Sequence, residues 1–95
     1  MKNALETLRN FFGSTVHLMA GNVATLEGYE ALSDWGADSV RCNVGGGSIC
    51  STRIQTGHGV PGLQTIMDCA ISDRDAKIIA DGGIRSSGDV VKALA

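Results

Sequence analysis

The spacing of apolar residues predicts two amphipathic helices in the N-terminal part of the chain. The first covers residues 3–12 and can end at Gly13, while the second can be capped by Thr25 and ended by Gly36. The first helix places its apolar residues on one face, at Leu5, Leu8, Phe11 and Phe12. The second is expected to direct toward a core the side chains of Leu26, Tyr29, Leu32 and Trp35.

Two further helices are predicted in the second half of the chain. One begins near Pro61, a residue that suits the first turn of a helix. Its apolar positions are Leu63, Ile66, Met67 and Ala70. The other can be capped by Ser86 or Ser87 and is expected to run through Leu94.

Three short apolar runs between these helices predict strands at residues 16–20, 39–44 and 77–80. Helices and strands then alternate, an order that predicts parallel strands joined by crossover helices. It fits either a doubly wound sheet or part of a (β/α)8 barrel. Three strands cannot close a barrel of eight, and a complete barrel typically needs about 250 residues. We therefore expect an α/β fold in which residues 1–95 form a single partial segment.

Composition, charge and cysteine content narrow the class of protein. Hydrophobic residues make up 43% of the chain and charged residues 19%, which is ordinary for a globular domain. A net charge of −2, the lack of a basic cluster and an aromatic content of 4% argue against nucleic acid as a partner. We expect neither a signal peptide nor a membrane span. Three cysteines without paired spacing favour a reducing, cytoplasmic compartment.

A glycine-rich segment that contains a cysteine, GGGSICSTR at residues 45–53, follows the second predicted strand. In parallel α/β folds the active site lies at the carboxyl ends of the strands. Glycines there let the backbone approach a ligand, and the hydroxyls and the arginine near Cys50 favour its nucleophilic thiolate form. The segment is therefore a candidate nucleophile loop. A structural turn with an inert, buried cysteine is the alternative.

Polar or glycine-rich loops also follow the other two strands. After the third strand, Gly82 and Gly83 leave bare backbone N–H groups for a phosphate, and Asp81 can accept hydrogen bonds from a ribose diol. An Asp-Gly turn before a helix cap is the alternative. Asn22 follows the first strand, either as a ligand-binding residue or as a turn residue before Thr25. Because parallel strands end at one edge of a sheet, the three loops are expected to converge on one rim.

The motifs in these loops resemble those of the IMP dehydrogenase/GMP reductase family. GGGSICSTR is similar to its catalytic-cysteine loop, GHGVP to the segment after that loop, and IADGGIRSSGDVVKALA to its nucleotide-binding strand. MAGNVAT and WGADSVR match earlier segments in the same order, so the resemblance covers about residues 16–95. It implies a TIM-type (β/α)8 barrel, of which this chain would hold about three strands and four helices.

The resemblance implies an oxidoreductase of purine nucleotide metabolism. Cys50 would attack C2 of the purine to form a covalent thioimidate, and Thr52 would take part in proton transfer. In the dehydrogenase, NAD accepts a hydride from IMP and water then releases XMP. In the reductase, GMP loses ammonia and NADPH delivers a hydride to give IMP. Ile84 and Arg85, after the double glycine, look more like the dehydrogenase.

The same resemblance assigns binding roles to three sets of residues. The purine mononucleotide, IMP or GMP, would be held by Ser48, Asp81, Gly82 and Gly83. The nicotinamide cofactor would lie toward Asn22, Arg41, Asn43, Val44 and Gly45. A potassium ion would be bound by the carbonyl groups of Gly45, Gly47 and Cys50.

Four residues depart from the usual pattern of the family. Asn43 stands where glycine is usual, Gly46 where proline or another residue is common, and Gly62 where glutamine is frequent. Ser51 replaces a common threonine, which is a mild change. We expect Asn43 to alter the approach of the cofactor, Gly46 to loosen the loop and Gly62 to remove a loop contact.

Parts of the family's barrel have no counterpart in this sequence: the earlier strands, the last strand and the mobile flap that activates water. We therefore expect no turnover from this chain alone, and we expect it to be a truncated product, an excerpt or one part of a split protein. Since the family usually forms tetramers, the partners expected are copies of the same protein or a chain that completes the barrel. A nucleotide-binding module without catalysis and an α/β scaffold with an inert cysteine are the rival hypotheses.

The remaining cysteines and histidines are expected to be structural. Cys42 alternates with other apolar residues on the second strand, and Cys69 lies on the apolar face of the third helix. His17 is expected inside the first strand and His58 in a glycine loop. No metal-ligand spacing links either histidine to a cysteine pair, so zinc is not expected.

Overall fold

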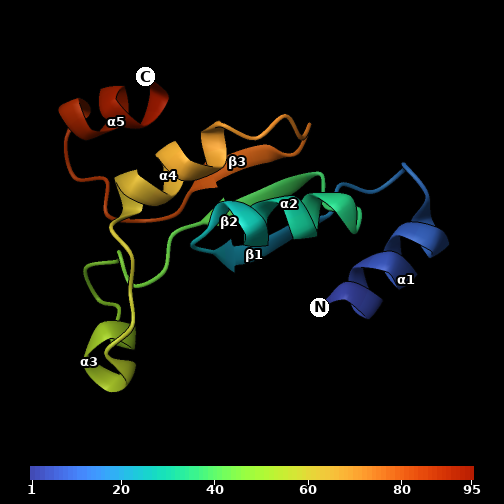
Figure 1. The fold of residues 1–95 in the computed structure, drawn as a ribbon, viewed down its shortest axis with the longest axis horizontal. Coiled ribbons are helices and arrows are strands. Elements are labelled where there is room, and N and C mark those ends of the chain that lie inside the picture. Colours follow the sequence, from blue (N-terminus) through green and yellow to red (C-terminus); the bar gives the residue numbers. More distant parts are fainter.

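A computed structural model describes residues 1–95, which form three strands and five helices (Figure 1). All strands pair in parallel, in the order β1-β2-β3, which confirms the predicted α/β fold of parallel βα units. The strands are β1 (Met19–Val23), β2 (Ser39–Cys42) and β3 (Lys77–Ala80). The helices are α1 (Lys2–Phe12), α2 (Leu26–Asp34), α3 (Thr52–Thr56), α4 (Gly62–Ala70) and α5 (Ser87–Leu94).

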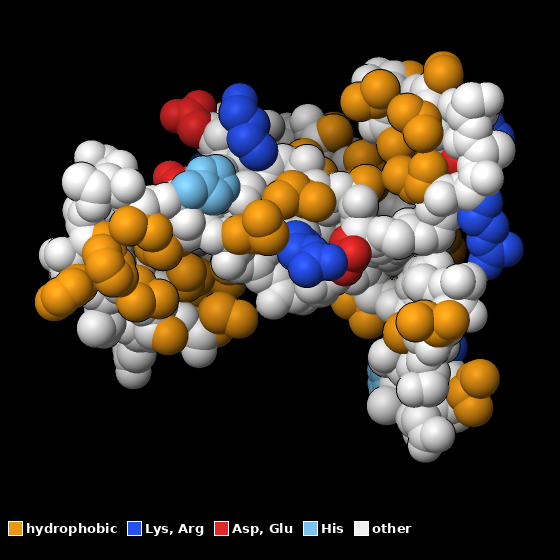
Figure 2. Space-filling view, turned by 180° about the vertical axis from the view of Figure 1, so that it is seen from behind, with side chains coloured by type: hydrophobic (Ala, Val, Ile, Leu, Met, Phe, Trp, Pro, Cys, Tyr) orange, Lys and Arg blue, Asp and Glu red, His pale blue; other side chains and the backbone are white.

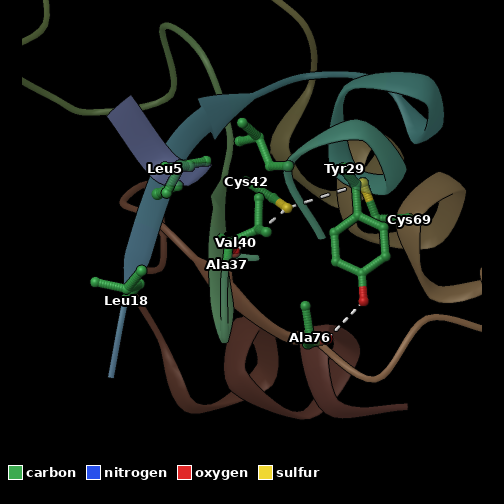
Figure 3. Close-up of a cluster of buried hydrophobic side chains, with 10 residues drawn as sticks. Leu5, Leu18, Tyr29, Ala37, Val40, Cys42, Cys69 and Ala76 are labelled. Atoms are coloured by element: carbon green, nitrogen blue, oxygen red, sulfur yellow. Dashed lines mark hydrogen bonds between the residues drawn. The ribbon is translucent and has the colours of Figure 1, made fainter. Parts of the chain in front are cut away.

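One face of the sheet is covered by α2 and α4, and the core lies between them and the strands (Figure 3). Val40 and Cys42 of the central strand are fully buried in one cluster with Tyr29 of α2 and Cys69 of α4. The Tyr29 hydroxyl donates a hydrogen bond to the Ala76 carbonyl, which satisfies its polar end inside the core. This core fixes β2 and β3, and with them the loops that follow these strands.

The opposite face of the sheet is open. Met19 of β1 and Arg41 of β2 are both exposed on it, because side chains alternate between the two faces of a strand. The outer strands, β1 and β3, also leave one edge each unpaired. A segment of a closed barrel is expected to have this form, since closure would pair both edges and cover the inner face.

The first strand lies farther along the chain than the sequence predicts. The prediction of residues 16–20 is wrong by three residues, since β1 begins at Met19 and ends at Val23. His17, predicted inside the strand, lies before it and hydrogen-bonds the first serine of β2 at 2.9 Å. β1 continues through Gly21, where a Cβ would lie only 2.7 Å from the Arg41 carbonyl oxygen. A glycine that reads as a loop residue therefore permits close strand pairing.

The region after β2 also differs from the prediction. β2 ends at Cys42 rather than at residue 44, because the backbone of Asn43 adopts a positive φ of 133°. Val44 makes only an isolated antiparallel bridge to Val60. Between these two residues the chain forms α3, a fifth helix where the sequence predicts four. The five residues of α3 are too few and too polar to show a helical period.

Only part of the apolar face predicted for α1 is buried. Leu5 lies in the core, and Figure 2 shows apolar side chains gathered at the surface of this end of the molecule. The exposed members of the predicted face are Leu8, Phe11 and Phe12. Polar contacts attach α1 instead, since Arg9 Nε donates to the Gly36 carbonyl at 3.0 Å and Arg9 Nη2 to Asp38 at 2.6 Å. None of the five helices is long and apolar enough to cross a membrane.

Helix α4 turns a different face to the core than its apolar pattern predicts. Leu63 and Met67 are 43% and 57% exposed, whereas Thr65 and Cys69, one turn apart, are 0% exposed. Small side chains let α4 approach the sheet closely, and Ile66 packs at the margin of the core as predicted. Leu63 and Met67 stay outside this contact because each is two residues from Thr65, a spacing that places side chains on different faces of a helix.

Candidate active site

The residue after β3, Asp81, joins the ends of all three strands. Its carboxylate accepts hydrogen bonds from Arg41 Nη2 and from Asn22 Nδ2, each at 2.6 Å. Its backbone N–H donates to the Cys42 carbonyl at 3.1 Å, which extends the pairing of β2 and β3. The hydrogen bonds from Arg41 and Asn22 hold the pKa of Asp81 below its usual range. The three strand ends therefore meet at one rim, as the sequence predicts.

Replacing Arg41 with methionine is expected to lower stability at neutral pH but not in acid. A carboxyl group whose pKa is depressed in the folded state contributes stability above its unfolded pKa of about 3.9, and this contribution disappears as pH falls through the folded pKa. The pair is partly exposed, with 45% of the Arg41 side chain and 31% of the Asp81 side chain accessible. We therefore expect a loss of only about 0.5 kcal/mol at neutral pH.

Urea unfolding of both proteins at about pH 7 and about pH 2.5 measures this difference. Lys77→Met is the matched control, because Lys77 is exposed on the neighbouring strand and makes no ion pair. The control should change stability equally at both pH values. A deficit of Arg41→Met that persists undiminished in acid would contradict the prediction.

Cys50 lies half-buried on the loop between β2 and α3. Its Sγ is 3.2 Å from Thr52 Oγ1, and its backbone N–H donates to the Gly47 carbonyl at 3.1 Å, which closes a tight turn. Hydrogen bonds from the Thr52 hydroxyl and backbone, and the positive charge of Arg53, lower the pKa of the Cys50 thiol. The thiolate, which is the nucleophilic form, is therefore favoured at this cysteine.

The other two cysteines have the opposite surroundings. Cys42 and Cys69 are fully buried, with their Sγ atoms 3.8 Å apart (Figure 3). Burial raises the pKa of Cys42 to about 12 and also raises the pKa of Cys69. Both are poor nucleophiles, which confirms their prediction as core residues and leaves Cys50 as the one reactive thiol of the three.

The turn after Asp81 touches the cysteine loop directly. Gly82 and Gly83 have φ of 79° and 75°, a left-handed conformation that favours glycine. A Cβ on Gly83 would lie 2.9 Å from the Gly46 carbonyl oxygen, and one on Gly82 would lie 3.5 Å from Gly47 Cα. Glycine at these positions lets the two backbones approach this closely. The predicted phosphate turn and the predicted nucleophile loop thus form one surface.

A cavity of about 410 Å³ lies between these two loops, α4 and α5. Its volume is in the range of small-molecule binding sites. All four predicted nucleotide-binding residues line it: Ser48, Asp81, Gly82 and Gly83. Three members of the predicted cofactor and potassium sets also line it: Asn43, Gly45 and Gly47.

Five predicted site residues are not in the lining of this cavity. Cys50 lies farther along the loop, beyond Ser48, Thr52 begins α3, and Val44 pairs with Val60 instead. Asn22 and Arg41 contact Asp81 from the side of β1 and β2. The structure therefore assembles the nucleotide set in one cavity, with the reactive thiol on the same loop but outside the cavity wall.

Three cationic side chains in the cavity wall are not among the binding residues that the sequence predicts. Arg53 comes from the start of α3, Arg85 from the turn before α5, and Lys92 from α5 itself. The first two stand inside the glycine motifs, and this proximity was the available signal for an anion site. Lys92 had no such signal, because only the tertiary fold brings the α5 side chain over the loops.

The three carbonyl groups predicted to bind potassium lie on one loop, at Gly45, Gly47 and Cys50. The Gly47 carbonyl already accepts the Cys50 N–H. No group of three or more His, Cys, Asp or Glu side chains is arranged to hold a metal ion. Carbonyl oxygens suit hard cations, but three of them do not complete the coordination sphere of such an ion. Further ligands would have to come from outside this loop. The potassium site stays a prediction.

Comparison with known proteins finds that the chain is similar to members of one protein family. All residues 1–95 match a family model described as IMP dehydrogenase / GMP reductase domain. The chain is 55% identical to the inosine-5'-monophosphate dehydrogenase of Aquifex aeolicus and 50% identical to that of Nitrosopumilus maritimus, over 99% of its length in each case. It covers 20% and 21% of these proteins, so it spans about a fifth of the length of the curated relatives it matches.

Solved structures give the same relationship for the fold. The chain superimposes on an inosine 5' monophosphate dehydrogenase from Legionella pneumophila with a TM-score of 0.88 and 54% identity, covering 99% of this chain and 28% of that one. It superimposes on a GMP reductase from Trypanosoma brucei with a TM-score of 0.86 and 41% identity, covering 98% of this chain and 21% of that one. The three strands and their loops therefore have counterparts in both kinds of enzyme.

Proposed function

Because the chain belongs to the IMP dehydrogenase / GMP reductase family, we propose that it is a segment of the catalytic barrel of an oxidoreductase that converts IMP to XMP with NAD. The observation that carries this proposal is the contact between two loops. One loop bears a thiol whose pKa is lowered, and the other is a left-handed double glycine after Asp81. Residues 1–95 would then form a single partial segment of the barrel domain.

In the proposed reaction the Cys50 thiolate attacks C2 of the purine and forms a carbon–sulfur bond. The hydrogen on C2 leaves as a hydride, so the base is oxidised to a thioimidate. NAD, when bound, supplies the acceptor for that hydride. Thr52, whose hydroxyl lies 3.2 Å from Sγ, would stabilise the thiolate before attack and the leaving thiolate afterwards. Attack of water on C2 then breaks the bond to sulfur, releasing XMP and the free cysteine.

The nucleotide would be held by the cavity beside the thiol. Ser48 and the backbone N–H groups of Gly82 and Gly83 would bind its phosphate, and Asp81 would accept hydrogen bonds from the ribose hydroxyls. The positive charges of Arg85 and Lys92 in the cavity wall support an anionic ligand. Asp81 suits the acceptor role, because a carboxylate accepts hydrogen bonds and the contacts with Arg41 and Asn22 stabilise its ionised form.

The nicotinamide cofactor would lie on the side of Asn22, Arg41 and the backbone of residues 43–45. Asn22 and Arg41 are held in place by Asp81, so both side chains project from a fixed rim. This placement fits NAD as well as NADPH. The higher identity to the dehydrogenase structure, 54% against 41% for the reductase, favours NAD and IMP. A GMP reductase that uses NADPH is the second candidate, supported by the TM-score of 0.86.

The open face and the unpaired edges of the sheet indicate that this segment needs further strands as partners. Closing the barrel would require strands beside β1 and β3, supplied by the same protein or by another chain. We propose that the segment alone binds nucleotide without turnover, and that activity requires the completed barrel in a homo-oligomer. A potassium ion on the loop carbonyls would belong to that complete form.

Incubation with a chloropurine mononucleotide tests the proposal directly. The thiolate of Cys50 should displace chloride, and mass spectrometry should find one nucleotide on the peptide that contains Cys50. Excess IMP should slow this labelling at least tenfold, and the chloropurine nucleoside, which lacks the phosphate, should react at least tenfold more slowly. IMP binding without an adduct would favour a non-catalytic nucleotide-binding module. If neither IMP binding nor an adduct is found, the proposal is refuted in favour of an inert α/β scaffold.

A further inference from the structure

Asn43 occupies the centre of the rim where the three strands end. It is 5% exposed and has a φ of 133°, a backbone conformation that side-chain-bearing residues rarely adopt. Its backbone N–H donates to the Val23 carbonyl at 3.0 Å, and its carbonyl accepts from Asn22 Nδ2 at 3.1 Å. The main chain of Asn43 is thereby tied to β1 on both its donor and its acceptor.

The side chain of Asn43 reaches in the other direction, to the exit of β3. Asn43 Nδ2 donates to the Asp81 carbonyl at 2.9 Å and lies 3.5 Å from the Gly82 carbonyl. The amide cannot be turned around, because Oδ1 would then face two carbonyl oxygens. As it stands, Oδ1 is buried and has no hydrogen-bond partner, which is unfavourable. The contacts of Nδ2 and the packing of the amide must therefore outweigh that cost.

Gly46 and Gly62 both lie against this amide. A Cβ on Gly46 would lie 2.1 Å from Asn43 Nδ2, and a Cβ on Gly62 would lie 2.9 Å from the same atom. Both distances are shorter than real Cβ contacts, so a side chain at either position would displace the amide from its hydrogen bonds. Gly46 lies on the cysteine loop and Gly62 at the start of α4. Three residues that are separated in the sequence therefore form one steric arrangement in space.

We propose that Asn43 is a positioning residue that clamps the cysteine loop to the turn after Asp81, and that Gly46 and Gly62 provide the space it needs. The clamp would act through Asp81 and Gly82, whose main chain it holds, and so would set the distance between Ser48 and the double glycine. Its effect on nucleotide binding rests on the proposed function, whereas the steric coupling does not. IMP affinity and thermal unfolding measure these two parts separately.

Asn43→Asp tests the clamp with almost no change of shape. The aspartate places oxygen against the Asp81 and Gly82 carbonyls where Nδ2 now donates. We expect the IMP dissociation constant to rise at least tenfold, measured by calorimetry. Cys69→Ala is the control for stability, because it weakens the core away from the cavity and should leave IMP affinity within twofold. The clamp is refuted if Asn43→Asp binds IMP like the native chain, or if Cys69→Ala loses affinity equally.

A double-variant cycle tests the space requirement and needs no ligand. Gly46→Ala should lower the thermal unfolding midpoint by several degrees when Asn43 is present, and by less than one degree in the Asn43→Gly background. Gly62→Ala should behave in the same way. Equal effects of the alanine in both backgrounds would overturn the coupling. If the native chain does not bind IMP, the proposed function fails, but this cycle still decides whether the three residues act as a unit.

Discussion

Replacing Cys50 with serine is expected to slow the incorporation of iodoacetamide into the folded chain by at least about 100-fold. The alkylation rate follows the thiolate fraction and its access to solvent. The Cys42 pKa of about 12 leaves a thiolate fraction of about 10⁻⁴ near pH 8, and burial hides both Cys42 and Cys69 from the reagent. Cys50 is half-buried and its pKa is lowered, so it should carry nearly all of the reaction.

The source of this reactivity can be separated from mere exposure. Thr52→Val removes the hydroxyl that contributes most to the lowered pKa of Cys50, so the midpoint of the alkylation rate against pH should move upward. Cys69→Ala should leave both the rate and the midpoint unchanged. All three cysteines should react once the chain is unfolded in urea. Rapid labelling that survives Cys50→Ser in the folded chain would show that a core cysteine is accessible, contrary to the prediction.

The sequence predicted those parts of the fold that depend on local patterns. The β3 bounds at 77–80 match because an apolar run ends at an Asp-Gly turn, and Ser86 caps α5 as predicted, with its Oγ accepting from Asp89 N–H at 3.3 Å. β1 was misplaced because Gly21 and Asn22 look like a loop in isolation. Gly21 is placed in the strand by close pairing with Arg41, which is a nonlocal contact, and Asn22 lies at an irregularity of the same pairing.

In the candidate site, too, local features could be predicted from the sequence and features that depend on packing could not. The sequence indicated the strand-end loops and the reactive Cys50, because glycine runs and hydroxyl neighbours are local features. It did not indicate that Arg41 and Asn22 share the carboxylate of Asp81, nor that Lys92 lines the cavity, since both depend on how separate elements pack. The role of each site residue in binding or catalysis stays a prediction until the variants are measured.

Gly83→Ala is expected to weaken IMP binding at least tenfold. The added Cβ would lie 2.9 Å from the Gly46 carbonyl oxygen, a contact with backbone that no side-chain rotation relieves. The cysteine loop must then move away from the turn after Asp81, which separates Ser48 from the backbone donors that would share the phosphate with it. Such a displacement should also remove the protection that IMP gives Cys50 against alkylation. Calorimetry with IMP and competition in the alkylation assay measure the two effects.

Gly57→Ala isolates the contribution of that contact from backbone strain. Gly57 has a φ of 73°, almost the same as the 75° of Gly83, but a Cβ there would meet nothing within 4 Å. Both variants therefore carry a similar left-handed strain of about 1 kcal/mol, and only Gly83→Ala also forces two loops apart. If Gly57→Ala lowers the unfolding midpoint and keeps its affinity for IMP, the loss in Gly83→Ala belongs to the loop contact. If both variants lose affinity alike, general strain explains the effect, and the shared surface of the two loops has no special part in binding.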